Sequence, residues 1–548
     1  MIFKSVFKTL PKPTRPFCYT LLNALWKHGK RAALIDPQNK AHVTYHDLYL
    51  QSLSVSAFLK HQKFHHGNVA CTVMHNCSEF LPIFLGTALR GGTFSPASNS
   101  YNEREIEYQL KDSKSNMVYC HEMNFEKVYS AADKCADLKS IVVVPDHTSK
   151  LRDGYPSGVI HFDDVLAYQP DLNIPEIDVD IDREPLILPY SSGTTGPPKG
   201  VMLSNTNVSM QVDIVGRHFE EQILGKIDPN YNFQKEKNIM FLPLYHIYGF
   251  CMFMSNIVQG VPTVLMTRFD SELFCKSVEQ YRPRFMQVVP PIMVFFSKHP
   301  IVDKYDLSSL ETLIVAAAPV GKELCEDVMK RLPNLKSVGQ GYGMTETTAA
   351  VHIMVHGEHK FDSIGKLCAN HEMKFVDPET GKDLGANEKG ELCVKGPCIM
   401  LGYLNRPQAT ADTIDDDGWM HTGDIGYVDD DGFAYIVDRL KELIKVKGLQ
   451  VPPAELEDLL LTHPSIQDAA VIGIPDESSG EVPMAFVVRK DESLQEQEVV
   501  DYVKERVAKY KQLAGGVQFI REIPKSPSGK ILRRFLRDEA KLLKEKCV

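Results

Sequence analysis

The sequence lacks the features that mark several common protein classes. Its 548 residues include 12 cysteines, none spaced as a CxxC pair, and their positions are irregular. This argues against a zinc ribbon and a disulfide scaffold and indicates a reducing compartment. The formal charge of -10 is spread along the chain, which argues against a nucleic-acid partner. Internal repeats and low-complexity tracts are also missing, which argues against a repeat architecture.

Acidic residues are missing from the start of the chain, where the first is Asp36. Such a basic segment is either a transit peptide or a solvated leader before the first helix, and residues 1–16 are interpreted as a leader. No apolar run of signal-peptide type is present, and the final residues Lys546-Cys547-Val548 are a poor peroxisomal address. We therefore expect a cytoplasmic or organellar location, either mitochondrial or peroxisomal.

Charge is missing from Asn238 to Thr267, a stretch long enough to cross a bilayer. The stretch contains prolines, glycines and polar side chains, each of which would need a partner in lipid. The better interpretation is a buried strand, a loop that carries His246, a core helix and a second strand. No membrane span is expected.

What is present is an alternation of strand-like and helical patterns from Phe17 to Asp377, which predicts βαβ units and mainly parallel sheets. From Asp377 to Asp438 short strands alternate with Gly and Asp turns, which predicts a small antiparallel or barrel-like unit. A new pattern begins after residues 438–441. The predicted fold class is α/β, with two sheet subdomains and the barrel-like unit in residues 17–437 and a small α+β domain in residues 442–548.

The strongest motif is the glycine-rich string YSSGTTGPPKGV, Tyr190 to Val201. Glycines let backbone N–H groups approach phosphate oxygens, hydroxyls add donors, and a lysine adds positive charge. The spacing differs from that of a Walker A loop, because Gly200 rather than Ser or Thr follows Lys199. The predicted phosphate-binding residues are Ser191, Ser192, Gly193, Thr194, Thr195, Gly196 and Lys199.

This string and the motifs after it resemble those of the AMP-forming acyl-CoA synthetases, a superfamily that includes 4-coumarate:CoA ligases, beetle luciferases and peptide-synthetase adenylation domains. The other motifs are LPLYHIYGF, VAAAPVGKEL, QGYGMTE, HTGD, DRLKELIKVKGLQ and PKSPSGKILRR, in that order. The resemblance extends from Phe17 to Arg537. It implies ATP, Mg²⁺ and coenzyme A as ligands.

By resemblance, His246 of LPLYHIYGF lies near the adenylate and the path of the incoming thiol. A lone histidine in an apolar run is otherwise a satisfied core residue. Where related ligases often begin the acyl-pocket strand with Ser-Gly, this chain has Val315 and Ala316, and the added volume should reshape the pocket. The predicted pocket lining is His246, Tyr248, Val315, Ala316, Ala317 and Gly341.

In QGYGMTE, the resemblance implies that Tyr342 stacks on adenine and that Thr345 holds the α-phosphate or the acid. Glu346 would bind Mg²⁺, which prefers carboxylate and phosphate oxygens. Asp424 of HTGD would accept the ribose hydroxyls, and Arg439 would donate to the same ribose. Outside this context Asp424 is one acidic turn residue among many.

The resemblance also implies a hinge at residues 438–441, with Lys441 within it, about which a mobile C-terminal domain rotates between two half-reactions. In the thioester-forming state the loop with Lys445, Lys447, Gly448 and Gln450 would face the active site. Lys530, in a Ser/Pro/Gly loop before a helix, would stabilise charge during adenylation. The predicted catalytic residues are Lys530, His246, Thr345 and Glu346.

Together these features predict an ATP-dependent acid:CoA ligase. Its partner would be a small hydrophobic carboxylic acid, fatty or aryl, and both a monomer and a homodimer remain open. The alternatives are a luciferase-like monooxygenase, an adenylation enzyme that serves a carrier protein, and a non-catalytic binding homologue. The last predicts damaged motifs, yet Lys199, Glu346, Asp424, Arg439 and Lys530 are all in place.

Overall fold

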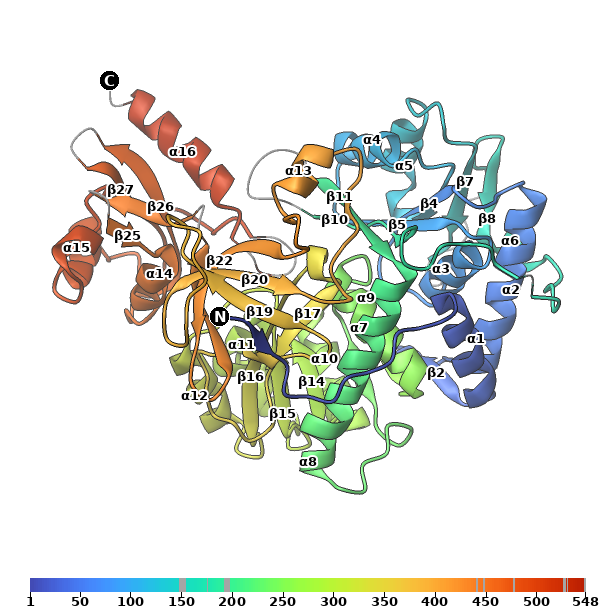
Figure 1. The fold of residues 1–548 in the computed structure, drawn as a ribbon, viewed down its shortest axis with the longest axis horizontal. Helices are drawn as coiled ribbons and strands as arrows, with labels where there is room; N and C mark the ends of the chain where they lie inside the picture. Colours follow the sequence, from blue (N-terminus) through green and yellow to red (C-terminus); the bar gives the residue numbers. More distant parts are fainter. Residues whose placement is uncertain are drawn as a thin grey trace.

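The chain folds into a large body and a small C-terminal lobe that projects from it (Figure 1). The computed structural model describes residues 1–146, 154–174, 176–191, 198–439, 442–446, 449–476, 479–525, 529 and 531–546. The side chains of residues 438, 439, 445, 449, 450 and 544–546 are outside this description.

One nine-stranded sheet is built mainly from the first third of the chain, in the order β10-β11-β9-β5-β4-β6-β7-β8, with β21 paired to β11. Strands β5, β4, β6, β7 and β8 run parallel, and helices connect β4 to β5, β5 to β6 and β6 to β7, which confirms the predicted βαβ units. The strands are β4 (Val69–Val73), β5 (Thr93–Ala97), β6 (Met117–His121), β7 (Ser140–Val144), β8 (Val159–His161), β9 (Pro185–Ile187), β10 (Tyr190–Ser191), β11 (Lys199–Ser204) and β21 (Gly402–Tyr403). The connecting helices are α3 (Phe80–Ala88), α4 (Glu103–Asp112) and α5 (Phe125–Ala132), and α6 (Phe162–Leu166) follows β8.

A ten-stranded sheet has the order β1-β19-β20-β22-β23-β18-β17-β16-β15-β14. Only β14, β15 and β16 run parallel within it, and the antiparallel unit expected for residues 377–438 continues into them through β18 and β17. The strands are β1 (Phe3–Lys4), β14 (Phe285–Val288), β15 (Thr312–Val315), β16 (Ser337–Met344), β17 (Ala349–Ile353), β18 (Gly365–Leu367), β19 (Glu372–Val376), β20 (Gly390–Lys395), β22 (Met420–Val428) and β23 (Phe433–Arg439). Nearby helices are α10 (Ser271–Tyr281), α11 (Pro290–Lys298), α12 (Lys322–Arg331) and α13 (Pro407–Ala411).

The uncharged stretch forms the strand, loop, helix and strand that its sequence predicts. Strands β12 (Asn238–Met240) and β13 (Thr263–Leu265) flank helix α9 (Ile247–Gln259) and join β2 (Ala32–Ile35) and β3 (His42–Thr44) in a four-stranded sheet. Among the helices of the described residues, none has both the length and the apolar character needed to cross a bilayer.

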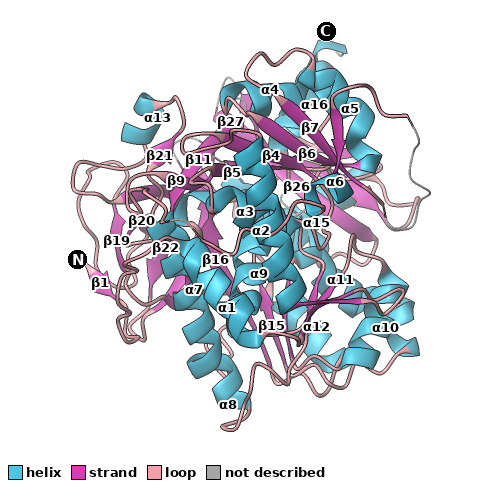
Figure 2. Ribbon diagram, turned by 90° about the vertical axis from the view of Figure 1, so that its right-hand side faces the viewer, coloured by secondary structure: helices cyan, strands magenta, loops and turns pink. Residues whose placement is uncertain are grey.

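Helices fill the space between the two large sheets (Figure 2). This layer contains α1 (Phe17–His28), α2 (Tyr45–His61), α3, α7 (Asn205–His218) and α9, and α8 (Gly225–Ile227) lies beyond it. Aromatic rings connect this layer to the nine-stranded sheet. The ring centroids of Phe250 on α9 and Phe84 on α3 are 5.1 Å apart, and those of Phe84 and Phe94 on β5 are 5.3 Å apart. Both large sheets therefore pack against one apolar core.

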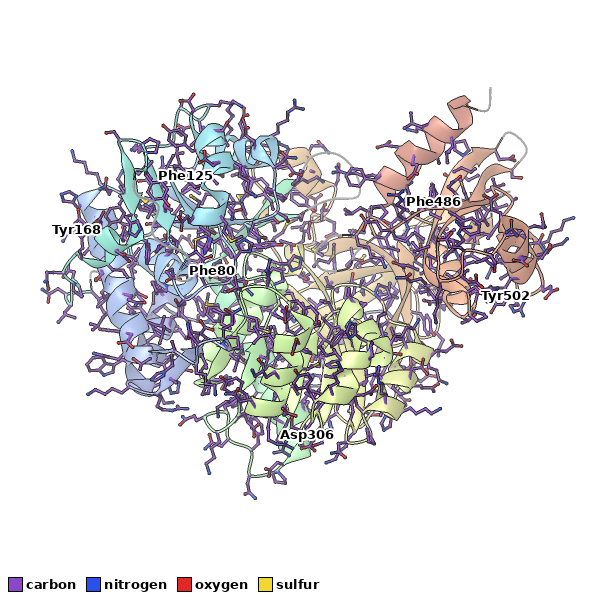
Figure 3. The ribbon with its side chains drawn as sticks, turned by 180° about the vertical axis from the view of Figure 1, so that it is seen from behind. Phe80, Phe125, Tyr168, Asp306, Phe486 and Tyr502 are labelled. Carbon is purple, nitrogen blue, oxygen red and sulfur yellow. The ribbon has the colours of Figure 1, made fainter. Side chains whose placement is uncertain are left out.

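The small lobe has a sheet of its own in the order β25-β24-β27-β26, with β28 beside β27. Neighbouring residues of β26 point to opposite faces of the sheet and enter different cores. Val471 packs in the core with α14 and α15, and Ile472 packs in the core with α16. Figure 3 marks Phe486 and Tyr502 in this lobe and Phe80 in the body. The elements are β24 (Ile444–Val446), β25 (Leu449–Val451), α14 (Pro453–Leu461), β26 (Ile466–Asp476), β27 (Gly480–Arg489), α15 (Glu496–Lys504), β28 (Val517–Phe519) and α16 (Arg533–Lys546).

The N-terminal segment packs along the body. Strand β1 pairs antiparallel with β19, and the Ser5 hydroxyl donates to the Leu367 carbonyl at 2.9 Å. Further along, the Leu10 N–H donates to Asn370 Oδ1, and Asn370 Nδ2 donates back to the Leu10 carbonyl. The basic segment expected as a leader is thus part of the edge of the ten-stranded sheet in this structure.

Replacing Phe250 by alanine should lower the free energy of unfolding by about 3–5 kcal/mol, because the ring is fully buried between the sheets. Phe535→Ala is the matched control: this ring is 46% exposed, and its loss should change stability by less than about 0.5 kcal/mol. Urea unfolding of both variants measures the difference. Equal stability of the two variants would contradict this view of the core.

Candidate nucleotide and acid site

The carboxylate of Glu346 joins three distant segments of the chain. It lies in the short turn η4 (Thr345–Thr347) after β16 and is 7% exposed. Its Oε1 accepts hydrogen bonds from the Ser191 hydroxyl at 3.0 Å and from the Tyr403 hydroxyl at 2.9 Å. The glycine-rich string, QGYGMTE and the turn at residue 403 therefore meet at one buried anion.

A cation lies over the ring of Tyr403, one of the two donors to this carboxylate. Lys199, the first residue of β11, places its Nζ 4.6 Å from the centroid of the Tyr403 ring, a cation–π contact. Burial and the neighbouring charge of Glu346 raise the pKa of the Tyr403 hydroxyl, so this group remains a donor at neutral pH. The site thus presents two hydroxyls on a buried carboxylate and one ammonium over the Tyr403 ring, a combination suited to phosphate and to a metal ion.

Tyr342 and Asp424 are brought together as the nucleotide hypothesis requires. The Tyr342 hydroxyl donates to Asp424 Oδ2 at 2.5 Å, and Asp424 is 2% exposed. Asp424 lies on β22 opposite the backbone of Arg439 on β23. An aromatic ring beside a held carboxylate is an arrangement that can bind a base and a ribose.

Glu391 holds the part of strand β22 that carries Asp424. Its Oε1 accepts the Gly423 N–H at 3.0 Å, and its Oε2 lies 2.8 Å from His421 Nδ1. The Cys393 thiol and the Glu391 carboxylate, which both face Nδ1, raise the pKa of His421 to about 10. His421 is therefore an imidazolium at neutral pH, locked against the strand β20 that pairs with β22.

Glu391, Cys393 and His421 are also a group of metal-ligand type within the described residues, with their ligand atoms within 4.8 Å of one another. The 2.8 Å between His421 Nδ1 and Glu391 Oε2 is a hydrogen-bond distance. Two ligands of a tetrahedral zinc ion would lie roughly 3.3 Å apart. The geometry fits a hydrogen-bonded cluster better than a metal centre.

His246 caps α9, because its Nδ1 accepts the Tyr248 N–H at 3.3 Å. An accepting Nδ1 leaves the proton of a neutral ring on Nε2. The Tyr248 hydroxyl is buried without a hydrogen-bond partner among the described residues, and burial raises its pKa. Position 249 requires glycine, because a Cβ there would lie 2.2 Å from the Pro243 carbonyl oxygen.

The predicted pocket strand lies where β15 and β16 run side by side, with Val315 opposite Gln340. Val315 is fully buried, whereas Ala317 is exposed and has a φ of 79° in the left-handed region. A Cβ on Gly341 would meet nothing closer than the His352 carbonyl oxygen at 3.5 Å. The absence of a side chain at Gly341 therefore leaves space beside Ala316.

The small lobe touches the body next to the predicted pocket. A Cβ built on Gly529 would lie 2.8 Å from Cδ of Pro291, at the start of α11. Helix α11 follows β14, the neighbour of β15. The residue before Lys530 thus lies close to the carboxyl ends of the parallel strands.

Several predicted residues lie outside the part of the chain that the structure describes. They are Ser192, Gly193, Thr194, Thr195, Gly196, Lys441, Lys447, Gly448 and Lys530, together with the side chains of Arg439, Lys445 and Gln450. The backbone of Lys445 pairs with that of Gln450 in the β24–β25 hairpin. Thr345 is described and begins η4, beside Glu346.

Sequence reasoning missed Tyr403, which donates to Glu346, and Glu391, which accepts from Gly423 next to Asp424. Tyr403 stands in GYLNRP, upstream of the HTGD motif. Its position depends on the pairing of β21 with β11, which joins residues about 200 positions apart and leaves no local signal. Glu391 is likewise ordinary in sequence, as a charged residue near a turn.

Comparison with known proteins gives a consistent family. Residues 23–404 match the family model described as AMP-binding enzyme, and residues 455–530 match the AMP-binding enzyme C-terminal domain. A 4-coumarate–CoA ligase 2 from Nicotiana tabacum is 40% identical over 536 residues, which cover 96% of this chain and 94% of the relative. A 4-coumarate-CoA ligase 1 from Narcissus pseudonarcissus is also 40% identical, with 96% and 93% covered.

Solved structures have the same fold. An o-succinylbenzoate CoA synthetase from Bacillus subtilis, in complex with its acyl-adenylate intermediate, is 27% identical with a TM-score of 0.78, covering 96% of this chain and 99% of that one. An anthranilate CoA ligase in complex with anthranoyl-AMP has a TM-score of 0.85 at 24% identity, with 98% and 99% covered. The second likeness is one of fold alone.

The His421–Glu391 pair should stabilise the fold in a pH-dependent way. The folded pKa is raised to about 10 from an ordinary value of 6.5, so the stabilisation is complete below pH 6.5 and lost as pH rises toward 10. Glu391→Gln keeps an acceptor for Gly423 but removes the charge. The difference in Tm between wild type and variant should be largest at pH 6 and shrink toward pH 10, and a difference that is constant or widens over this range would contradict the assignment.

Proposed function

Because the chain belongs to the AMP-binding enzyme family, we propose that it activates a carboxylic acid as an acyl-adenylate and transfers the acyl group to coenzyme A. The observation that carries this proposal is the junction at Glu346. There the hydroxyls of Ser191 and Tyr403 donate to one buried carboxylate, and the ammonium of Lys199 lies over the Tyr403 ring. The Tyr342–Asp424 pair supplies a place for the nucleoside.

In the first half-reaction an oxygen of the acid attacks the α-phosphorus of ATP, and pyrophosphate leaves with the electrons of the broken P–O bond. Two anions must approach each other, so positive charge has to be supplied. Lys199 lies at the phosphate loop, and Lys530 follows Gly529, which packs on Pro291 beside the pocket strands. We assign Lys530 to the acid and α-phosphate and Lys199 to the leaving phosphates.

The residues at Glu346 fit a magnesium ion. Both hydroxyl donors bind the same oxygen, Oε1, and they hold the carboxylate in a fixed orientation in a polar, buried position. Mg²⁺ takes carboxylate and phosphate oxygens as ligands and would neutralise charge on the leaving pyrophosphate. Glu346 is the residue that would hold it.

In the second half-reaction the thiolate sulfur of coenzyme A attacks the acyl carbon, the C–O bond breaks, and AMP leaves. The Nδ1 of His246 accepts the Tyr248 N–H at 3.3 Å, so the neutral ring carries its proton on Nε2, and we assign His246 to orient the acyl group as a hydrogen-bond donor while the thiolate attacks. The loop between β24 and β25, with Lys445, Lys447, Gly448 and Gln450, would replace Lys530 at the site by rotation about residues 438–441.

For the acid we propose an aryl propenoate with a polar group on its ring. The curated relatives are named as 4-coumarate–CoA ligases. The buried Tyr248 hydroxyl lacks a partner among the described residues, and such a group is costly unless a ligand satisfies it. A straight alkyl tail would leave it unsatisfied, whereas a ring hydroxyl would accept its hydrogen bond.

Lys530→Ala should slow adenylate formation by roughly 100- to 1,000-fold, since it removes the cation at the developing charge. Thioester formation from supplied acyl-AMP should remain near the wild-type rate. Pyrophosphate release and acyl-CoA formation measure the two steps separately. Arg534→Ala, an exposed cation four residues away, is the control and should leave both steps unchanged. Equal loss of both steps in Lys530→Ala would contradict the role assigned.

Tyr248→Phe should reduce kcat/KM for 4-hydroxycinnamate by about tenfold while leaving unsubstituted cinnamate almost unchanged, because one hydrogen bond to the ring hydroxyl is lost. Initial rates of pyrophosphate release with both acids and with decanoate give the comparison. An equal effect on all three acids would place the Tyr248 hydroxyl away from the substrate ring.

A further inference from the structure

A second carboxylate holds the outer side of the β10–β11 hairpin. The Tyr190 hydroxyl donates to Asp112 Oδ2 at 2.9 Å, and Asp112 is the last residue of α4, with a side chain 11% exposed. The Tyr190 ring lies across the hairpin, because a Cβ on Gly200 would be 3.1 Å from its Cζ. The strand that begins the glycine-rich string is therefore fixed to helix α4.

Arg406 binds the same carboxylate from a third segment. Its Nη2 lies 3.3 Å from Asp112 Oδ1 and donates to the Tyr108 hydroxyl at 3.2 Å. The Tyr108 hydroxyl in turn donates to the Pro198 carbonyl at 3.0 Å. The network thus reaches Tyr190 on one side of residues 192–197 and Pro198 on the other.

Two carboxylates bridge the same two segments. Neighbouring residues of β10 point to opposite sides, so Tyr190 reaches Asp112 while Ser191 reaches Glu346. On the segment at β21, Tyr403 likewise reaches Glu346 and Arg406 reaches Asp112. The inner bridge contains the proposed site, and the outer bridge touches none of the reacting groups.

We propose that Asp112 and Arg406 are positioning residues for ATP: their ion pair sets the position of the hairpin that carries Ser191 and Lys199 relative to Glu346. This inference rests on the proposed function, since it assigns the hairpin to the phosphates. It predicts an effect on ATP and little effect on the acid, whose predicted pocket lies on β15, β16 and α9.

The physical basis is the difference between the two bridges. Strand β11 is held by its pairing with β9 and β21, whereas β10 is an edge strand that pairs with β11. The inner bridge holds β10 through one hydrogen bond, from the Ser191 hydroxyl to Glu346. The outer bridge adds fixed points at Tyr190 and Pro198. Preorganised donors bind an anion without ordering at the moment of binding, so loss of the outer bridge should weaken ATP binding.

The test is a double-mutant cycle with Asp112→Asn, Arg406→Gln and the double variant. Calorimetry of ATP binding in the absence of any acid gives Kd, and initial rates of pyrophosphate release give KM for ATP and for 4-hydroxycinnamate. Each single variant should raise the Kd and KM for ATP about fivefold or more and change KM for the acid by less than about twofold. The double variant should bind ATP no more weakly than the single variant with the larger loss of affinity, because both changes break the same bridge.

Arg406→Lys should recover part of the ATP affinity, since it retains the charge that faces Asp112. Arg331→Gln is the matched control. It breaks the ion pair at 2.7 Å between Asp303 and Arg331, the last residue of α12, and should leave ATP affinity unchanged. Unchanged ATP affinity in both single variants, or additive losses in the double variant, would overturn the inference. A wild-type protein that binds ATP but releases no pyrophosphate with any acid would contradict the proposed function, and the calorimetric cycle would still decide the inference.

Discussion

The site depends on one buried anion, because Glu346 is the point where three segments of the chain meet. Its Oε1 accepts from Ser191, 155 residues earlier, and from Tyr403, 57 residues later. A buried carboxylate is stable only with such donors, so the β10–β11 hairpin and the turn at residue 403 are needed to satisfy it. Lys199 lies over the Tyr403 ring, next to the same hairpin. Under the proposed function, the contacts that satisfy the buried charge also order the groups assigned to the nucleotide.

Around this anion the fold separates rigid parts from movable ones. The edges of both large sheets rest on one helical layer with an aromatic core, so Tyr342, Asp424 and the β10–β11 hairpin are held by the body. The small lobe has its own cores on both faces of its sheet. A lobe with an independent core can turn as a unit, and in the present arrangement Gly529 of the lobe packs against Pro291 at the start of α11.

Much of this organisation was predictable from sequence, for identifiable reasons. Short and long apolar runs locate strands such as β7 and helices such as α3, and the uncharged stretch around His246 is interpreted correctly because its polar residues exclude lipid. The order of motifs predicts the meeting of Tyr342 with Asp424. What local pattern cannot give is the pairing of Asp112 with Arg406, 294 residues apart, since each looks like a solvated surface charge. The continuation of the small antiparallel unit into the parallel strands likewise depends on long-range strand pairing.

The central claim is that an acyl-adenylate forms and is then cleaved by a thiol. The most direct test supplies 4-hydroxycinnamate labelled with ¹⁸O in its carboxylate, together with Mg·ATP and coenzyme A, and follows the products by mass spectrometry. Attack of the carboxylate on the α-phosphorus, followed by C–O cleavage, transfers one labelled oxygen to AMP and gives the coenzyme A thioester. Unlabelled AMP, or release of ADP and phosphate in place of AMP and pyrophosphate, would contradict the account.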